Sequence, residues 1–374
     1  MLHPDSNELI INREEITKTT IAYCSKLLTN RAPRQGFEED ILMKDLIHTS
    51  RMSDLNGPDC KLTLEMFHAS LDELSKKNKE KYQFILNGGE DLRQAIFYLF
   101  KKVWLSEQMP ELWRQTTIVQ LYKGKGDKRS FSNQRNIHTK PEITKFFGHL
   151  VMSQVKEKLM ANVSKFQIGA KSGHRVQEHL FSLKSIVALY CLHGYPVIIQ
   201  LFDIQKFFYR ESLRDGLDAL YNYGVRGKLL RLLYMMNKDT VIRVKRAVGM
   251  TSKIKTGENI GQGTTEGAVI SAASLDYTLN KFFGSSKAEL SYGPEKILPL
   301  MFQDDICRLS LTLKDAQKGN DTLESALEIK LLDFNLDQSC CLIMESNQGR
   351  KRWTKDMSKN PLTSCKRPMN IATN

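Results

Sequence analysis

The sequence predicts an α+β fold in which apolar strands and amphipathic helices follow one another without internal repeats. The chain has 374 residues, of which 41% are hydrophobic and 26% are charged, as in ordinary globular proteins. A chain of this length can bury a sizeable core without disulfide bonds. These values exclude small disulfide-stabilised domains and wholly disordered chains, and they allow two or three domains or one large multi-lobed fold.

The elements follow from the spacing of apolar residues. Residues 1–85 are polar and weakly periodic, and they predict only helical segments. The stretch 91–113 predicts a helix that Pro110 ends, and it is followed by a predicted strand over 116–122 and core helices over 141–160 and 176–192. The remainder predicts a continuous apolar strand over 196–202, helices over 213–220 and 229–233, a strand over 241–246, a helix over 261–282, a strand over 298–308, a helix over 323–334 and a strand over 340–344.

The charge of the chain favours a polyanionic partner. Lys and Arg number 55 against 42 Asp and Glu, which gives a net charge of +13. Nucleic acid is favoured over an acidic membrane surface, because the basic clusters lie in turns and strands rather than on an amphipathic helix.

Cysteine usage and hydropathy exclude several classes of protein. The seven cysteines are scattered, with no C-x-x-C pair, so we expect an intracellular, reduced protein without structural zinc. The amino terminus lacks a secretory signal pattern, and no apolar stretch approaches the ~18 residues of a membrane span.

Carboxylates are placed on two of the predicted apolar strands. Asp203 directly follows the strand over 196–202, and Asp304 and Asp305 interrupt the strand over 298–308. Three ionised carboxylates beside apolar strands repel one another unless a cation neutralises them. Oxygen ligands suit Mg²⁺, and two such ions ~4 Å apart serve in-line phosphoryl transfer.

Several ordered motifs surround these acids. Phe-Asp-Ile-Gln-Lys-Phe-Phe (202–208), Gly-Gln-Gly (261–263) and Phe-Gln-Asp-Asp (302–305) resemble the palm motifs of reverse transcriptases. Four upstream segments resemble the enzymes of non-LTR (LINE-type) retrotransposons: Pro110-Glu-Leu-Trp113, Ile118 to Asp127, Asn133-Gln-Arg-Asn-Ile137, and Gln167-Ile-Gly-Ala through Phe181. The resemblance covers about residues 60–345.

The resemblance implies a right-hand polymerase fold, with fingers, a palm built on an antiparallel sheet backed by helices, and a missing thumb. It divides the chain into an N-terminal extension (1–85), fingers (86–195), a palm (196–345) with inserted fingers helices and ribbon at about 217–258, and a basic tail (346–374). With no thumb, endonuclease or Cys/His knuckle expected, the chain resembles a fragment or degenerate copy of such a protein.

The resemblance also implies roles for individual residues. Asp203 and Asp304 are the expected principal ligands of Mg²⁺, or alternatively Mn²⁺, with Asp305 adjoining them. Phe208 is expected beneath the sugar of the incoming nucleotide, which favours dNTP over NTP, and Gln262 against that nucleotide. The expected triphosphate contacts are Lys123, Lys125 and Arg135. Arg243, Lys245 and Arg246 are expected on one cationic strand face that follows the template-primer backbone.

The chain departs from the family pattern at Tyr209, Ala272, Gln303 and Gln338. The last matters most, because the family usually has a lysine there that protonates pyrophosphate, and glutamine cannot act as that acid.

The first hypothesis is therefore an RNA-directed DNA polymerase with RNA template, DNA primer or target, and dNTP as partners. A nuclear site of action is implied by the resemblance alone. The second is a weakly active remnant that binds nucleic acid. An RNA-dependent RNA polymerase is disfavoured by Phe208 and by Phe302-Gln303.

Overall fold

A computed structural model describes residues 1–29, 61–169, 171–257, 260–284, 290–292, 295–344, 363–364 and 367–371. The chain separates into two compact units. Unit 1 consists of Met1–Ala161 and Ser212–Ile270, and unit 2 consists of Asn162–Glu211 and Ser271–Asn374. The stretch 217–258, expected as an insertion into the palm, belongs to unit 1. Most of the expected basic tail lies outside the described residues.

Unit 1 has a helical part with an aromatic core. Its helices are α1 (Arg13–Thr29), α3 (Leu64–Lys77), α4 (Lys79–Asn87), α5 (Gly89–Ser106), α6 (Glu142–Met160), α9 (Leu213–Asn222) and α10 (Lys228–Asn237), with short 3-10 turns η1 (Glu111–Arg114) and η2 (Phe131–Asn133). Phe67 on α3, Phe100 on α5 and Phe146 on α6 are fully buried, with ring centroids 4.8–5.8 Å apart. Edge and tilted ring contacts of this kind stabilise the core beyond the effect of the area that these side chains bury.

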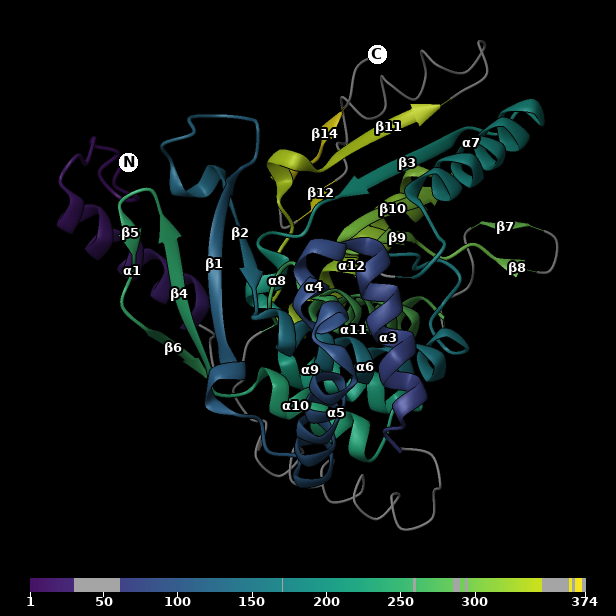
Figure 1. The fold of residues 1–374 in the computed structure, drawn as a ribbon. Coiled ribbons are helices and arrows are strands. Elements are labelled where there is room, and N and C mark those ends of the chain that lie inside the picture. Colours follow the sequence, from purple (N-terminus) through teal and green to yellow (C-terminus); the bar gives the residue numbers. More distant parts are fainter. Residues whose placement is uncertain are drawn as a thin grey trace. The chain divides into compact units, whose positions relative to one another are not determined.

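Unit 1 also contains a five-stranded sheet. Its strands are β1 (Gln115–Tyr122), β2 (Gln134–Thr139), β4 (Thr240–Arg246), β5 (Gly249–Met250) and β6 (Ile254–Gly257). They lie in the order β2-β1-β4-β5, and β6 also pairs with β4 (Figure 1). Strand β1 is antiparallel to β2 and parallel to β4. One face of this sheet buries Ile118, Ile242 and Val244, and the opposite face is largely exposed.

Unit 2 is built on a second five-stranded sheet. Its strands are β3 (Val197–Phe202), β9 (Leu300–Phe302), β10 (Asp305–Ser310), β11 (Cys340–Met344) and β14 (Asn370–Ile371), in the order β14-β11-β3-β10-β9. All pairs are antiparallel except β11 with β14. Short strands β7 (Ser291–Tyr292) and β8 (Glu295–Lys296) form a separate pair, as do β12 (Thr363–Ser364) and β13 (Arg367–Pro368).

Helices cover both faces of the central strand β3. Ile198 and Phe202 share a core with residues of α12 (Leu313–Glu328) and of the carboxyl-terminal part of α11 (Thr265–Phe283). Val197 and Ile199 face the other side, where α7 (Val176–Leu192) packs on the sheet (Figure 1). A strand covered on both faces is mostly apolar, which explains the hydrophobic residues of β3. Its one polar residue, Gln200, is buried and has hydrogen bonds with Asn320 and Arg308.

The predicted mixture of helices and an antiparallel sheet is confirmed, and the predicted strands over 116–122, 196–202, 241–246 and 340–344 are present within one residue at each end. Four expectations are wrong. The strand over 298–308 is a hairpin of β9 and β10, and the helix expected to end at Pro110 ends at Ser106. The helix expected over 323–334 is α12, which begins at Leu313 and ends at Glu328, and α7 is not a core helix because it has no fully buried residue. Among the described residues, no helix is long and apolar enough to span a membrane.

Candidate active site and nucleic-acid interface

The sheet of unit 2 brings the three predicted carboxylates to one end. Phe202 of β3 lies opposite Ile306 of β10, so Asp203 and Asp305 are the next residues at the same end of the two antiparallel strands. Asp304 stands beside Asp305 in the two-residue turn of the β9–β10 hairpin, in which Phe302 pairs with Asp305. Strand pairing therefore assembles a site from residues about 100 positions apart in the sequence.

Asp203 is fixed by the loop that precedes β11. Asn335 Nδ2 donates a hydrogen bond of 2.8 Å to Asp203 Oδ2, and the Asn335 backbone N–H donates to the Asp203 carbonyl at 2.8 Å. The Asp203 N–H donates in turn to Ser339 Oγ at 3.2 Å. These contacts orient the carboxylate with neutral groups, so they leave its negative charge uncompensated.

The electrostatics of the site show mutual repulsion among the carboxylates. Burial and the negative charges of Asp305 and Asp203 raise the pKa of Asp304 to about 6. Burial and the charge of Asp203 raise the pKa of Asp305. Within the described ranges, no Lys or Arg forms an ion pair with any of the three. The site thus concentrates negative charge that a bound cation would neutralise.

A cavity of about 330 Å³ opens beside these carboxylates. Asp203, Asp305 and Gln338 contribute polar groups to it. The rest of its lining is mostly apolar and comes from α7, β3, β9 and β10: Val176, His179, Leu180, Leu183, Leu201, Phe202, Leu300, Phe302, Ile306 and Cys307. A pocket with an apolar wall and a few polar groups at one place is typical of a small-molecule site.

The carboxylates fit a Mg²⁺ ion whose ligands come partly from the protein and partly from water and substrate, rather than an ion enclosed by protein ligands alone. The described residues contain no group of three or more His, Cys, Asp or Glu arranged to hold one metal ion. Mg²⁺, however, commonly takes one or two protein carboxylates and completes its shell with waters and substrate phosphates. The all-oxygen chemistry and the unneutralised charge of the carboxylates are compatible with that mode of binding.

The structure distinguishes the two neighbouring phenylalanines after Asp203. Phe207 begins the short helix α8 (Phe207–Arg210) and is buried in the core of unit 2. Phe208 is half-buried and packs edge-on against Phe207, with ring centroids 5.7 Å apart. Phe208 is therefore the one of the two whose ring is still accessible.

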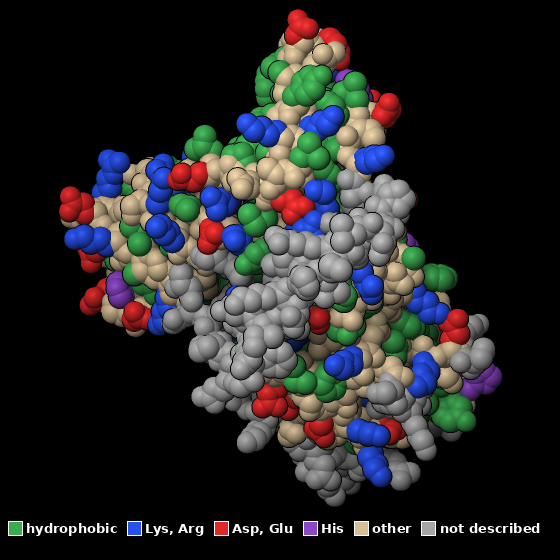
Figure 2. All heavy atoms as spheres, turned by 90° about the horizontal axis from the view of Figure 1, so that it is seen from below, with side chains coloured by type: hydrophobic (Ala, Val, Ile, Leu, Met, Phe, Trp, Pro, Cys, Tyr) green, Lys and Arg blue, Asp and Glu red, His purple; other side chains and the backbone are tan. Residues whose placement is uncertain are grey.

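Unit 1 carries a second candidate surface, the exposed face of its sheet. Arg243 lies opposite Thr117, Lys245 opposite Val119, and Arg135 opposite Leu121. Because alternate strand residues share a face, Arg135, Arg243 and Lys245 are all on this side, where each is exposed. We call these three residues, with Val119 and Ile137 between them, the basic face. Figure 2 shows Lys and Arg side chains spread over the described surface in that view, with hydrophobic side chains between them.

The expectation that Arg246 belongs to the same face is wrong. Arg246 follows Lys245 directly and so points to the opposite side of β4, where its guanidinium lies 4.6 Å from the centre of the Phe131 ring. Burial lowers the pKa of this half-buried arginine. Arg246 therefore packs against Phe131 and does not lie on the basic face.

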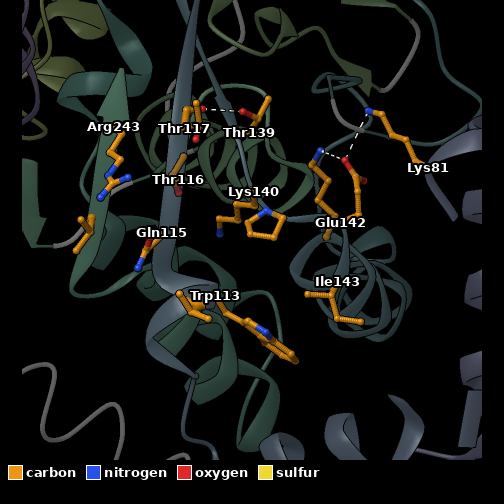
Figure 3. Close-up of a pocket in the computed structure, with 14 residues that line it drawn as sticks. Lys81, Trp113, Gln115, Thr116, Thr117, Thr139, Lys140, Glu142, Ile143 and Arg243 are labelled. Carbon is orange, nitrogen blue, oxygen red and sulfur yellow. Dashed lines mark hydrogen bonds and ion pairs between the residues drawn. The ribbon is translucent and has the colours of Figure 1, made fainter. Parts of the chain in front are cut away.

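A cavity of about 650 Å³ is hollowed into one end of the basic face (Figure 3). Four cationic side chains and one carboxylate line it: Lys81, Lys140, Lys145, Arg243 and Glu142. Glu142 is shared by two of the lysines, with Lys145 Nζ at 2.9 Å and Lys81 Nζ at 3.7 Å from its Oε1. Thr116, Thr117 and Thr139 add hydroxyl groups to the lining, so the cavity suits an anion better than a cation.

The other predicted nucleotide-binding residues also lie in unit 1. The Gln262 carbonyl accepts a hydrogen bond of 2.8 Å from His138 N–H, which holds the Gly-Gln-Gly segment against β2. Gly263 has φ 95°, and a Cβ there would lie 2.9 Å from Ile137 Cγ2, so glycine is required on both counts. Lys123 Nζ donates to the Ser132 carbonyl at 2.8 Å, whereas Lys125 is exposed at the tip of the loop.

The structure thus sorts the predicted site residues into two groups. Asp203, Asp304, Asp305 and Phe208 belong to unit 2, and the remaining predicted residues belong to unit 1. Sequence reasoning assigned no role to Asn335, Ser339 or Gln167, all of which contact the carboxylate-bearing segments. All three lie in segments compared with the family pattern, Gln167 in the segment from 167 to 181 and the other two beside Gln338, but nothing in those segments indicated their contacts.

Comparison with known proteins gave no match to a family model or to a curated protein. Similar solved structures include telomerase from Candida tropicalis with the TWJ fragment of telomeric RNA (12% identity, TM-score 0.46, 68% of this chain and 45% of that one). Others are Candida albicans telomerase with the TWJ fragment (11%, 0.46, 92% and 76%) and apo Candida tropicalis telomerase truncated from its C-terminal domain (10%, 0.47, 92% and 80%). The chain spans less than half of the first, and likenesses at these TM-scores do not establish a shared family or activity.

Proposed function

We propose that this chain is an RNA-directed DNA polymerase of the non-LTR retrotransposon type, which transfers dNTPs onto a primer 3′-hydroxyl. The observation that carries the proposal is the convergence of Asp203, Asp304 and Asp305 at one end of the unit 2 sheet, without a cationic partner among the described residues. The order of the motifs around these acids and the basic face of unit 1 support it.

The residues of the site then have distinct tasks. Asp203 and Asp304 would hold Mg²⁺, with Asp305 beside them, and the bound metal would supply positive charge for activating the 3′-hydroxyl and stabilising the triphosphate. Asn335 keeps the Asp203 carboxylate in one orientation through its 2.8 Å hydrogen bond. Phe208 would pack against the sugar and select against a 2′-hydroxyl.

The basic face and its cavity would contact a polynucleotide. Arg135, Arg243 and Lys245 are exposed cations separated by half-exposed apolar side chains, a combination that suits phosphates and bases together. On single strands, each phosphate contact contributes about 0.7 to the slope of log binding constant against log salt. Arg243→Ala and Lys245→Ala should therefore each reduce that slope for single-stranded RNA by about 0.7. Lys77→Ala, which removes a surface lysine of α3 paired with Glu73, serves as the control.

Primer extension tests the proposed activity. The protein is given an RNA template, a labelled DNA primer, dNTPs and Mg²⁺, and wild type is compared with Asp304→Asn. We expect extension by wild type and a loss of at least about a thousandfold in the variant, because the amide cannot replace an ionised metal ligand. Asp337→Asn, at an exposed carboxylate near Gln338, should retain activity. Extension that is equal in Asp304→Asn and wild type would refute the assignment of the site.

A second candidate function is nucleic-acid binding without efficient polymerisation. Gln338 favours it, because this residue lines the cavity beside Asp203 and an amide cannot donate the proton that pyrophosphate departure requires. Salt-dependent RNA binding that needs Arg243 and Lys245, together with no Asp304-dependent extension, would support this function over the first.

A further inference from the structure

The hairpin turn that carries Asp304 is contacted by a distant segment of unit 2, residues 166–169. The Met301 N–H donates to the Phe166 carbonyl at 2.7 Å, and the Ile168 N–H donates to the Met301 carbonyl at 3.1 Å. His179 Nε2 on α7 lies 2.9 Å from the Phe166 carbonyl and 3.1 Å from the Met301 carbonyl. Since both partners are acceptors, this nitrogen carries the proton. The free edge of β9 is thereby covered.

The Gln167 side chain extends this pairing into the turn itself. It is fully buried, and its Nε2 donates to the Gln303 carbonyl at 3.1 Å. Its Oε1 accepts from the Gln303 N–H at 3.1 Å and from the Gly169 N–H at 2.9 Å. Gln303 is half-buried at the tip of the two-residue hairpin, where backbone groups shielded from water take hydrogen bonds from other segments. One side chain supplies hydrogen bonds to both the N–H and the C=O of Gln303.

Close packing makes this arrangement specific. A Cβ on Gly169 would lie 2.3 Å from the Gln303 nitrogen and 3.0 Å from its Cα, so only glycine allows the segment to approach the turn. Gly169 is not among the glycines with positive φ, so space rather than backbone conformation requires it.

The turn is also one that its own sequence does not favour. Gln303 has φ 59°, in the left-handed region, at the first central position of a two-residue hairpin. Glycine is the usual residue there, and a side chain makes the conformation unfavourable. Such a conformation persists when neighbouring contacts over-determine it. The contacts of Gln167 are of this kind.

We propose that Gln167 is a positioning residue that holds the Gln303–Asp304 turn in the geometry that presents Asp304 and Asp305 to the reaction. The proposal rests on the function proposed above, in which these carboxylates are catalytic. Gln167 itself touches no reacting group, and it acts through the backbone of Gln303.

A rescue experiment tests this role. Gln167→Met removes the three hydrogen bonds at nearly constant volume, and we expect kcat for single-nucleotide incorporation to fall about ten- to hundredfold, with KM for dNTP changing less than about threefold. Adding Gln303→Gly should restore at least about half of the lost log kcat, since glycine adopts positive φ without a partner. The matched control is Gln154→Met, at a buried glutamine of α6 in unit 1, and it should leave kcat unchanged. Unchanged kcat in Gln167→Met, or no rescue by Gln303→Gly, would overturn the proposal.

Amide hydrogen exchange gives a readout that needs no activity. The N–H groups of Gln303 and Gly169 should exchange at least about tenfold faster in Gln167→Met, whereas amides in the middle of β3 should not change. If the wild type shows no Asp304-dependent extension, the proposed function fails and exchange alone decides whether Gln167 holds the turn. Equal exchange in variant and wild type would overturn the positioning role. Should Gln167→Met not fold, Gln167→Leu takes its place, since it also removes the three hydrogen bonds and adds no buried charge.

Discussion

The buried ion pair between Lys140 and Glu266 gives a quantitative test of how unit 1 is stabilised. Lys140 Nζ lies 2.5 Å from Glu266 Oε1, and both side chains are only 6% exposed. In Lys140→Met the cation is replaced by an apolar group of similar length, and Glu266 is left buried without its partner. Breaking a buried pair from one side costs about 3–5 kcal/mol, because the remaining charge is uncompensated.

The loss should depend on pH in a definite direction. In the wild type, burial acts to raise the pKa of Glu266, but the charge and hydrogen bond of Lys140, together with hydrogen bonds from the Glu266 backbone and Thr264, outweigh it and leave this pKa below 4.5. The pair therefore stabilises the fold above pH 4.5, and this contribution is lost as the pH falls through the lower folded value. Without Lys140, burial dominates and the pKa of Glu266 rises above 4.5. Below that raised value, each pH unit removes about 1.4 kcal/mol of the difference between variant and wild type.

Urea unfolding followed by tryptophan fluorescence measures this difference. Trp104 and Trp113 both belong to unit 1, and Trp353 is replaced by Phe in every variant so that the signal reports on unit 1. We expect a destabilisation of about 3–5 kcal/mol at pH 7.5 that narrows steadily towards pH 4.5. Lys140→Met combined with Glu266→Gln should recover most of the stability, because no buried charge remains.

Lys145→Met is the control for this experiment, because it breaks a partly exposed pair with Glu142 at 2.9 Å and should cost less than about 1 kcal/mol. A difference between Lys140→Met and wild type that is the same at pH 7.5 and pH 4.5 would refute the assigned role of Glu266. So would a double variant as unstable as the single one.

Three further outcomes are expected. Gly319→Ala should destabilise the protein by about 2 kcal/mol and so lower its melting temperature, because the new Cβ would lie 1.7 Å from Arg308 Cζ. The same change in a helix usually stabilises, so a raised melting temperature would contradict this prediction. Gln338→Lys should accelerate single-nucleotide incorporation by restoring an acid beside Asp203, and an unchanged rate would remove Gln338 from the mechanism. Phe208→Ala should increase NTP incorporation relative to dNTP in competition assays, and an unaltered ratio would show that Phe208 does not select the sugar.

Local patterns were sufficient to predict most elements of the fold. The mostly apolar sequence of β3 reflects burial on both faces, and the acid that follows it is unusual enough to indicate a candidate site. The pairing of β3 with β10 is different, because register between strands about 100 residues apart depends on the packing of the whole unit. The sequence therefore identified Asp203, Asp304 and Asp305 as candidates, and the fold brings them to one end of the sheet.

The remaining differences have identifiable causes. Strand alternation alone separates Arg246 from Lys245, so its position on the opposite face was available from the sequence. The apolar content of α7 suggested a core helix. The helix packs on the sheet with only one row of its side chains, and Phe181 and Leu192 are exposed. The contact of Gln167 with Gln303 joins residues 136 positions apart, and no periodicity in either segment predicts a bond between a side chain and a turn.

The interleaving of the two units has a consequence for the order in which the protein can fold during synthesis. Unit 1 needs the segment Ser212–Ile270 for β4, the strand parallel to β1, so its sheet cannot be completed until β6 has been made at Gly257. At that point β3, which precedes Asp203, is still the only strand of its sheet that has been made, because β9, β10, β11 and β14 all follow residue 270. A ribosome that stops anywhere between these segments releases a chain with a complete sheet in unit 1 and one unpaired, strongly apolar strand. Such a strand is a target for aggregation and for chaperones.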